Sequence, residues 1–338
     1  MPRDKRLELP GAVYHVIVRG LERREIYKDA TDRKEFLRRL EKGLRETGDQ
    51  CYGWVLMPNH FHLLIRSGTK PLNELMRGLL TGYALYFNRR HRRSGYLYQG
   101  RYKSILCQED AYLLELVRYI HLNPMRGRLV KDLIELNKYP WSGHSVIMGH
   151  HKLPWQETGE LLSMFGQKKC EAVARYLEFV KDGLAMGKRD DLTGGGLIRS
   201  AGGWEGVLLL KKAKERWQGD ERILGDGDFV SQILKISEEE LERKEKLRRE
   251  GWTLDKLAER VCELMSIKKD ELLRRSRLNN ISRGRALFSY WASKELGVSG
   301  QEIAKYMGIS NGPVSKGIRQ GEKIAKNYKL KDIMQLRP

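Results

Sequence analysis

Two histidines, His60 and His62, stand two positions apart inside an apolar stretch of this 338-residue chain. Alternate side chains of a β-strand point to the same face, so both imidazoles would face the same way. Two such imidazoles can bind one divalent metal ion if at least one further ligand is present. A surface strand with two solvated histidines would show the same spacing. However, Leu63, Leu64 and Ile65 follow directly, which favours an internal strand whose imidazoles need polar partners.

A second pair, Tyr119 and Asn123, is spaced four residues apart just before Pro124. On a helix this spacing puts both side chains on one face. A phenol has a pKa of about 10 and attacks poorly unless a metal or a base assists it. Asn123 could supply a neutral oxygen ligand. The alternative is that Tyr119, one of 15 tyrosines, only packs against Leu116 and Ile120 in the core.

Cations and aromatic residues alternate between positions 88 and 103. Arginine binds phosphate and aromatic rings stack on unpaired bases, so this mixture suits single-stranded nucleic acid, either DNA or RNA. A solvated basic face is the alternative. The candidate DNA-binding residues of this run are Arg89, Arg90, Arg92, Arg93, Arg101 and Lys103.

The composition supports a nucleic-acid partner, because 64 Lys and Arg against 44 Asp and Glu give a net charge of +20. Such a charge attracts polyanions, although a ribosome-associated or membrane-surface protein could share it. No apolar stretch is long enough to span a membrane, and residues 1–10 do not resemble a signal peptide. The four cysteines are far apart and form no C-x-x-C pair. We therefore expect a cytoplasmic protein with reduced thiols and no membrane partner.

The elements that must position these side chains follow from the periodicity of the first 123 residues. The expected strands and helices alternate in the order β-α-β-β-α-β, followed by one more helix. We expect strands at 12–19, 51–57, 60–66 and 102–107, and helices at 31–47, 72–90 and 111–122. This order is typical of the ferredoxin-like fold, an α+β domain with an antiparallel sheet. Pro58 and Asn59 predict the turn between the two central strands.

The rest of the chain divides into a connector at 149–250 and an all-helical region at 251–338. In the connector we expect helices at 169–185, 204–217 and 237–250. Residues 297–320 predict a helix-turn-helix, whose second helix, at 313–324, would read a major groove. An ordinary pair of packed helices is the alternative. The candidate DNA contacts at or in the second helix are Ser310, Asn311, Ser315, Lys316 and Arg319.

Five motifs together resemble the REP-associated tyrosine transposases, which belong to the HUH single-stranded-DNA endonuclease superfamily. They occur in the order and approximate spacing of that family over residues 1–148. The motifs are Tyr14-His15-Val16 with Arg19-Gly20, Met57-Pro58-Asn59-His60-Phe61-His62-Leu63-Leu64, Gly100-Arg101-Tyr102-Lys103-Ser104, Arg118-Tyr119-Ile120-His121-Leu122-Asn123-Pro124, and Tyr139-Pro140-Trp141-Ser142.

This resemblance implies a catalytic domain at 1–148 that acts in DNA transposition and recombination. His60 and His62 match the metal-binding pair of the family, and Asn123 matches the position that completes the site with Mg²⁺ or Mn²⁺. Tyr119 matches the nucleophile that forms a 5′-phosphotyrosine bond. The implied substrate is hairpin-containing, REP-like single-stranded DNA, to which Arg19 would add a contact, and the implied assembly is a monomer or a homodimer.

Residues 252–330 are similar to the DNA-binding domain of the replication initiator DnaA. The likeness is carried by Arg285-Ala286-Leu287-Phe288-Ser289-Tyr290-Trp291-Ala292 and by the helix-turn-helix that follows. The chain departs from that family at Ser310-Asn311-Gly312-Pro313-Val314-Ser315, where the family has an Asp-His-Ser/Thr signature. The likeness implies double-stranded DNA as a second partner of a bacterial, nucleoid-associated protein. A non-catalytic DNA-binding regulator derived from a transposase is the alternative to an enzyme.

Overall fold

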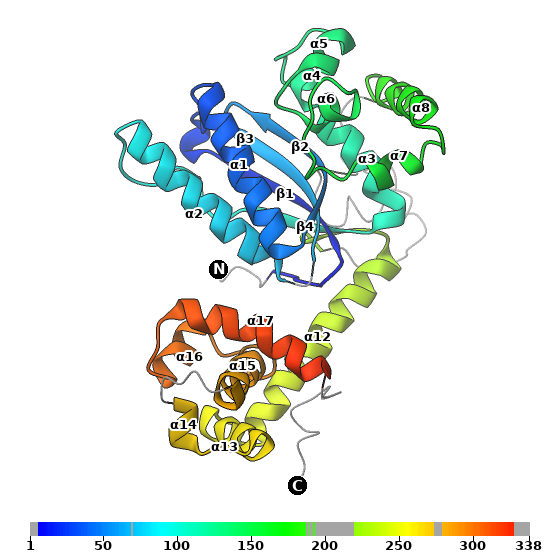
Figure 1. The fold of residues 1–338 in the computed structure, drawn as a ribbon. Helices are drawn as coiled ribbons and strands as arrows, with labels where there is room; N and C mark the ends of the chain where they lie inside the picture. The colour runs from blue at the N-terminus through cyan, green and yellow to red at the C-terminus, as the bar shows by residue number, and fades with distance from the viewer. Residues whose placement is uncertain are drawn as a thin grey trace. The chain divides into compact units, whose positions relative to one another are not determined.

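An α+β unit is followed by an all-helical unit (Figure 1), as the sequence predicted. The structure is a computed structural model that describes residues 6–68, 70–186, 189, 192, 220–273 and 279–327. The two compact units are Met1–Ile233 and Leu234–Pro338.

The first unit is built on a five-stranded sheet with the order β2-β3-β1-β4-β5. The strands are β1 (Val13–Arg19), β2 (Gln50–Met57), β3 (His60–Arg66), β4 (Lys103–Cys107) and β5 (Ile223–Leu224). The first four pair antiparallel in the ferredoxin-like order. The fifth pairs parallel with β4. The sequence analysis did not predict β5, because a two-residue strand shows no alternation of apolar and polar positions.

Two long helices, α1 (Ala30–Thr47) and α2 (Leu72–Arg90), cover one face of the sheet (Figure 1). The first helix begins where the Asp29 carboxylate accepts a hydrogen bond from the backbone N–H of Asp32, which satisfies one of the unpaired N-terminal donors. It ends at Gly48, whose φ of 74° is the left-handed conformation of a helix C-cap. Aromatic side chains of α1 and α2 pack against the sheet on this face. The candidate functional residues lie on the other face.

On the opposite face, α3 (Glu109–His121) packs against β1, β2 and β3 and leads into the short α4 (Asn123–Arg126). The register pairs Arg19 of β1 with His60 and Ile17 with His62. Residues opposed in an antiparallel ladder point to the same side. The sheet therefore presents both histidines to the face on which α3 lies.

Four further helices, α5 (Leu133–Lys138), α6 (Gly143–Ile147), α7 (Gly159–Ser163) and α8 (Lys169–Asp182), complete the described part of the first unit together with the 3-10 turn at Leu21–Arg23. The last two come from the segment expected to be a connector, and their buried residues belong to the same apolar core as α3. The expected helix at 169–185 is present as α8. The expected helix at 204–217 lies outside the described residues.

The second unit is entirely helical in its described part. Its helices, with α12 leading in from the first unit, are α12 (Gly227–Arg249), α13 (Leu254–Met265), α14 (Lys269–Leu273), α15 (Asn279–Lys294), α16 (Gly300–Tyr306) and α17 (Asn311–Asn327). Phe288 and Trp291 are buried in its core. A capping box at Ser299 starts α16, and Gly308, with φ of 60°, makes the turn into α17. Across the described ranges, no helix is both long and apolar enough to cross a membrane.

Candidate active site

The two histidines of β3 lie side by side, with ring centroids 5.3 Å apart. His60 is half-buried and places Nδ1 2.7 Å from Oδ1 of Asn59. Since an amide oxygen only accepts, Nδ1 of His60 carries the proton and Nε2 keeps its lone pair. His62 is 5% exposed, and its Nδ1 lies 2.9 Å from Nε2 of His15. One nitrogen of each ring is therefore oriented by a neighbour, as in metal-binding histidines.

His15 is a residue of the site that the sequence analysis did not select, although it stands in the Tyr14-His15-Val16 motif. It is buried in β1, and its ring stacks on that of His62 with centroids 5.1 Å apart. The signal that could have found it is alternation: His15 and Arg19 fall on the same face of β1. Only the pairing of β1 with β3 shows that this face carries the His62 ring.

The predicted nucleophile, Tyr119, reaches this histidine cluster from α3. Its ring lies edge-on to both His15 and His62, with centroid distances of 6.1 Å. The guanidinium of Arg126 lies 5.1 Å from the centre of the Tyr119 ring. Asn123 donates from Nδ2 to the Tyr119 carbonyl oxygen at 2.9 Å. This bond anchors the amide at the end of α3 and leaves Oδ1 as the acceptor of that side chain.

The four predicted residues His60, His62, Tyr119 and Asn123 line one pocket of about 1150 Å³. Of the charged residues around it, five are basic and two are acidic. The basic ones are Arg6, Arg19, Arg101, Lys103 and Arg222, and the acidic ones are Asp220 and Glu221. The structure therefore brings three of the predicted DNA-binding cations, Arg19, Arg101 and Lys103, to the same pocket as Tyr119.

Burial sets the protonation of the pocket. It lowers the pKa of His60 to about 4, with help from the charge of Arg19, and it lowers the pKa of His62 well below its usual value. Both imidazoles are therefore neutral near neutral pH, as metal ligands must be. Burial also raises the pKa of Tyr119, although the charges of Arg126 and Arg19 act in the opposite direction. The phenol is thus protonated and needs assistance before it can attack.

The donor set fits a divalent cation that shares its coordination with a substrate phosphate. His60 and His62 supply two neutral nitrogens, and Asn123 supplies an amide oxygen. Mg²⁺ and Mn²⁺ accept oxygen donors, and Mg²⁺ commonly keeps open positions for phosphate and water. Within the described ranges, no three His, Cys, Asp or Glu residues form a group that could hold a metal ion, so a metal at this histidine pair would need a ligand of another kind, such as the Asn123 amide oxygen.

Residues 9–123, which include His60, His62, Tyr119 and Asn123, match the family model described as "Transposase IS200 like". Residues 9–123 form an IS200-like transposase domain. Among solved structures, a REP-associated tyrosine transposase bound to a REP hairpin is similar to the chain, with 16% identity and a TM-score of 0.38. The similarity covers 46% of this chain and 98% of that one. No curated protein matches the chain.

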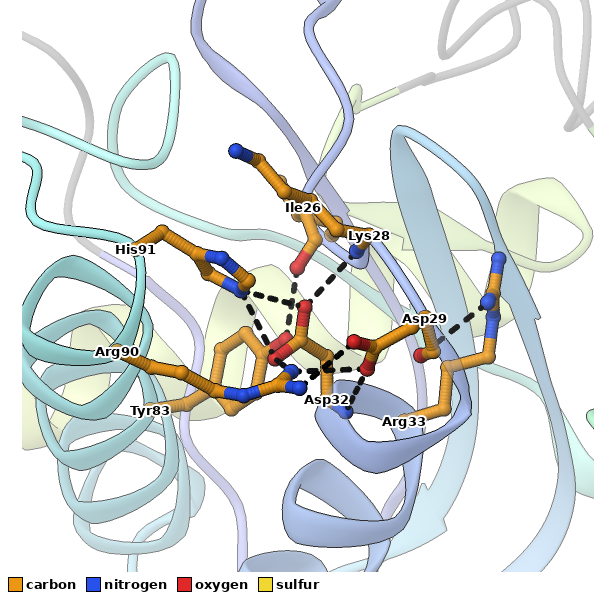
Figure 2. Close-up of polar contacts among 8 residues, drawn as sticks. All are labelled: Ile26, Lys28, Asp29, Asp32, Arg33, Tyr83, Arg90 and His91. Carbon is orange, nitrogen blue, oxygen red and sulfur yellow. Dashed lines mark hydrogen bonds and ion pairs between the residues drawn. The ribbon is translucent and has the colours of Figure 1, made fainter.

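The arginines at the end of α2 lie elsewhere in the IS200-like domain, and the described lining of the pocket contains none of them. Figure 2 shows Arg90 turned toward α1, where Nη2 binds Oδ2 of Asp29 at 2.7 Å and Nη1 binds the buried Asp32. His91 Nε2 lies 2.9 Å from Asp32 in the same cluster. Arg93 lies over the Phe87 ring. Arg90 and Arg93 therefore join helices or pack on them, whereas Arg89 and Arg92 are exposed.

We expect Arg90→Ala to lower the stability of the IS200-like domain and to leave DNA binding nearly unchanged. The substitution removes one partner of the fully buried Asp32, and an ion pair broken on one side leaves the other charge poorly compensated. The thermal midpoint should fall by a few degrees.

Arg101→Ala is the matched comparison, because Arg101 is exposed and lines the pocket. It should weaken single-stranded DNA binding by roughly fivefold and keep the midpoint. Differential scanning fluorimetry and fluorescence anisotropy measure the two effects, and the opposite pattern would show Arg90 to be a DNA contact.

The candidate contacts of the helix-turn-helix belong to the second unit. Ser310 precedes α17, and Lys316 and Arg319 are exposed on it. Asn311 and Ser315 are positions of α17 whose side chains lie outside the described part of the structure. Exposed polar and basic residues on the second helix of such a motif are what contact with a DNA groove requires.

Proposed function

We propose that the chain is a metal-dependent single-stranded-DNA endonuclease and strand transferase that forms a 5′-phosphotyrosine intermediate during DNA transposition. One observation carries the proposal. Tyr119 from α3, Asn123 from α4 and the histidine pair from β3 line a single basic pocket. A nucleophile, a metal-ligand set and phosphate-binding cations are the three parts that phosphodiester transfer needs.

In the proposed reaction, His60, His62 and Asn123 would hold a divalent metal ion, which would supply Lewis-acid polarisation of the scissile phosphate. Arg19, Arg101 and Lys103 bind the flanking phosphates and fix the strand in the pocket. The Tyr119 oxygen loses its proton to solvent and forms a bond to phosphorus, while the bond from phosphorus to the 3′-oxygen breaks. The 3′-oxygen leaves and takes up a proton. Arg126 and Arg19 favour the phenolate, because their charges lower the pKa of Tyr119.

The covalent intermediate explains how one site could both cut and rejoin DNA. The phosphotyrosine bond conserves the energy of the phosphodiester that was broken, so the 3′-hydroxyl of another strand can displace Tyr119 without a nucleotide cofactor. The volume of about 1150 Å³ and the surrounding cations suit an unpaired strand, and a hairpin-containing, REP-like strand is the proposed substrate. A monomer or a homodimer in the bacterial cytoplasm is proposed with it.

The second unit would add a contact to double-stranded DNA at the nucleoid. Its support is the exposed basic face of α17, with Lys316 and Arg319 at the start of the second helix of the motif. We propose that this unit selects the target while the pocket performs the cleavage. The non-catalytic regulator is the outcome that a failed cleavage test would favour.

The test is formation of a covalent adduct between the protein and a 3′-labelled single-stranded hairpin oligonucleotide, because the fragment on the 3′ side of the cut is the one that stays on Tyr119. Wild type should form the adduct with Mn²⁺ or Mg²⁺ and none with EDTA, because the phosphate then lacks its Lewis acid. His60→Ala and His62→Ala should each weaken Mn²⁺ binding, measured by calorimetry, by about tenfold or more, and should lower the cleavage rate. His150→Ala, at an exposed position, is the control and should change neither quantity.

Two outcomes would reject this function. Wild type that binds hairpin DNA but makes no adduct with either ion would be a regulator. Tighter binding to RNA than to the matched DNA strand would assign the pocket to RNA.

A further inference from the structure

Three polar side chains outside the pocket form a buried chain behind α3. The Tyr176 hydroxyl lies 2.7 Å from Nδ1 of His121 and 2.7 Å from Nδ1 of His144. His144 Nε2 lies 2.8 Å from Oδ1 of Asn137. His121, His144 and Tyr176 are each 0% exposed. His121 belongs to α3, whereas Tyr176 comes from α8, outside the segment that matches the transposase family.

The partners fix the direction of every hydrogen bond in this chain. Asn137 Oδ1 only accepts, so His144 carries its proton on Nε2. Burial lowers the pKa of His144 to about 4, so the ring is neutral and its Nδ1 accepts from the Tyr176 hydroxyl. The Tyr176 oxygen must then accept from Nδ1–H of His121. One tyrosine hydroxyl thus satisfies a buried donor and a buried acceptor together.

The surroundings of His121 are equally specific. A side chain at Gly143 would place its Cβ 2.9 Å from Nε2 of His121, which is too close for an unshifted contact. A Cβ at Gly53 would stand 3.5 Å from the same nitrogen. The ring is therefore enclosed by Gly53 of β2 on one side and by Gly143 of α6 on another.

This arrangement constrains the rotation of α3. His121 follows Tyr119 by two residues, which is about 200° around a helix, so the two side chains leave on nearly opposite sides. A rotation that moves Tyr119 relative to His62 must also move His121 away from Tyr176.

Arg118, which directly precedes Tyr119, also binds α8. Its Nη1 donates to the Phe179 carbonyl oxygen at 3.2 Å, and its guanidinium lies 4.1 Å from the centre of the Phe179 ring.

We propose that Tyr176 is a positioning residue for Tyr119, which it holds at the histidine pair by fixing α3 through His121 and His144. The inference rests on the proposed function, because it assigns α8 a part in the same reaction. The part of the chain that the reaction needs would then extend beyond residues 9–123, because α8 would set the position of the nucleophile Tyr119. Tyr176 itself touches neither DNA nor metal.

Tyr176→Phe tests this proposal, because it keeps the ring and removes only the shared hydroxyl. In the full-length protein, the single-turnover cleavage rate at saturating hairpin DNA should fall roughly 10- to 100-fold, as expected for a displaced nucleophile. The dissociation constant for the same DNA should stay within about twofold, since the pocket cations are untouched. Amide hydrogen exchange should become faster in α3 and stay unchanged in α1.

Tyr83→Phe is the matched control. Tyr83 is also fully buried, and its hydroxyl donates to the Ile26 carbonyl oxygen at 2.7 Å, but it belongs to α2, on the other face of the sheet from α3. Its loss should leave the cleavage rate unchanged. A general loss of folded protein would lower the amplitude of cleavage rather than its rate, so the rate separates positioning from stability.

Two results would overturn the proposal: a wild-type cleavage rate in Tyr176→Phe, or an equal loss of rate in Tyr83→Phe. Wild type that forms no adduct would reject the proposed function, and hydrogen exchange then decides the inference separately. Unchanged exchange of α3 in Tyr176→Phe would show that Tyr176 does not hold the helix.

Discussion

Tyr119→Phe will abolish the covalent adduct and reduce strand cleavage by at least about 1000-fold, the scale expected when a covalent nucleophile is removed. The substitution removes the only oxygen of that side chain and keeps its ring. The edge-on contacts with His15 and His62, at 6.1 Å between centroids, and the position of the ring beneath Arg126 depend on the ring. The proposed metal ligands and the proposed phosphate-binding cations therefore remain in place.

The binding of hairpin DNA and of Mn²⁺ by this variant should stay within about twofold of wild type. Denaturing electrophoresis of labelled DNA measures the adduct, and anisotropy and calorimetry measure the two affinities. Tyr112→Phe is the control, since Tyr112 is on the same helix and packs against the same core, and it should cleave normally. An adduct in Tyr119→Phe would mean that another residue is the nucleophile, and mass spectrometry of the DNA-linked peptide would identify it.

The order of strands and helices in the IS200-like domain could be predicted because each element carries its own periodic signal. The strands at 51–57 and 60–66 are set by apolar runs on either side of Pro58 and Asn59, and the structure has them at Gln50–Met57 and His60–Arg66. β5 could not be predicted in this way. Its two residues, Ile223 and Leu224, become a strand only because the edge of β4 offers partners, with Leu106 N donating to the Arg222 carbonyl oxygen at 2.7 Å.

Residue type and spacing in the sequence were enough to predict some residues of the site and not others. His60, His62, Tyr119 and Asn123 were selected from short-range patterns and from the family motifs, and they line one pocket. His15 and Arg126 were not selected, because their closeness to the site depends on the register of β1 and on the turn of α4. Charge alone also did not predict the ion pairs of Arg90: a basic run does not reveal which arginine has an acidic partner 61 residues away along the chain.

Tyr176 shows a different limit of the sequence. A tyrosine on the apolar face of an amphipathic helix usually indicates core packing, and Tyr176 is indeed 0% exposed. Its two histidine partners stand 55 and 32 residues away. No local pattern links Tyr176 to these two histidines. His121 lies within one motif of the family resemblance, and His144 follows another, Tyr139-Pro140-Trp141-Ser142, by two residues.

The close packing of α17 on α15 makes a second large effect predictable, this time in the helix-turn-helix unit. A side chain at Gly321 would place its Cβ 2.0 Å from the Ala286 carbonyl oxygen and 2.6 Å from its carbon. Both are backbone atoms inside a helix and cannot rotate away, so α17 would have to move off α15. Gly321→Ala should therefore destabilise the second unit by about 3 kcal/mol, at the upper end of the usual cost of overpacking.

If the second unit supplies the contact with double-stranded DNA, Gly321→Ala should weaken duplex binding at 37 °C and leave hairpin cleavage by Tyr119 at the wild-type rate. Gly312→Ala is the matched control in the same helix, because a Cβ at Gly312 meets nothing within 4 Å, and alanine is the better helix former. It should keep or slightly raise the stability. Circular dichroism melting, duplex anisotropy and the adduct assay measure the three effects on full-length protein. Equal loss of cleavage and duplex binding in Gly321→Ala would contradict the division of labour, because cutting would then depend on an intact α15–α17 contact.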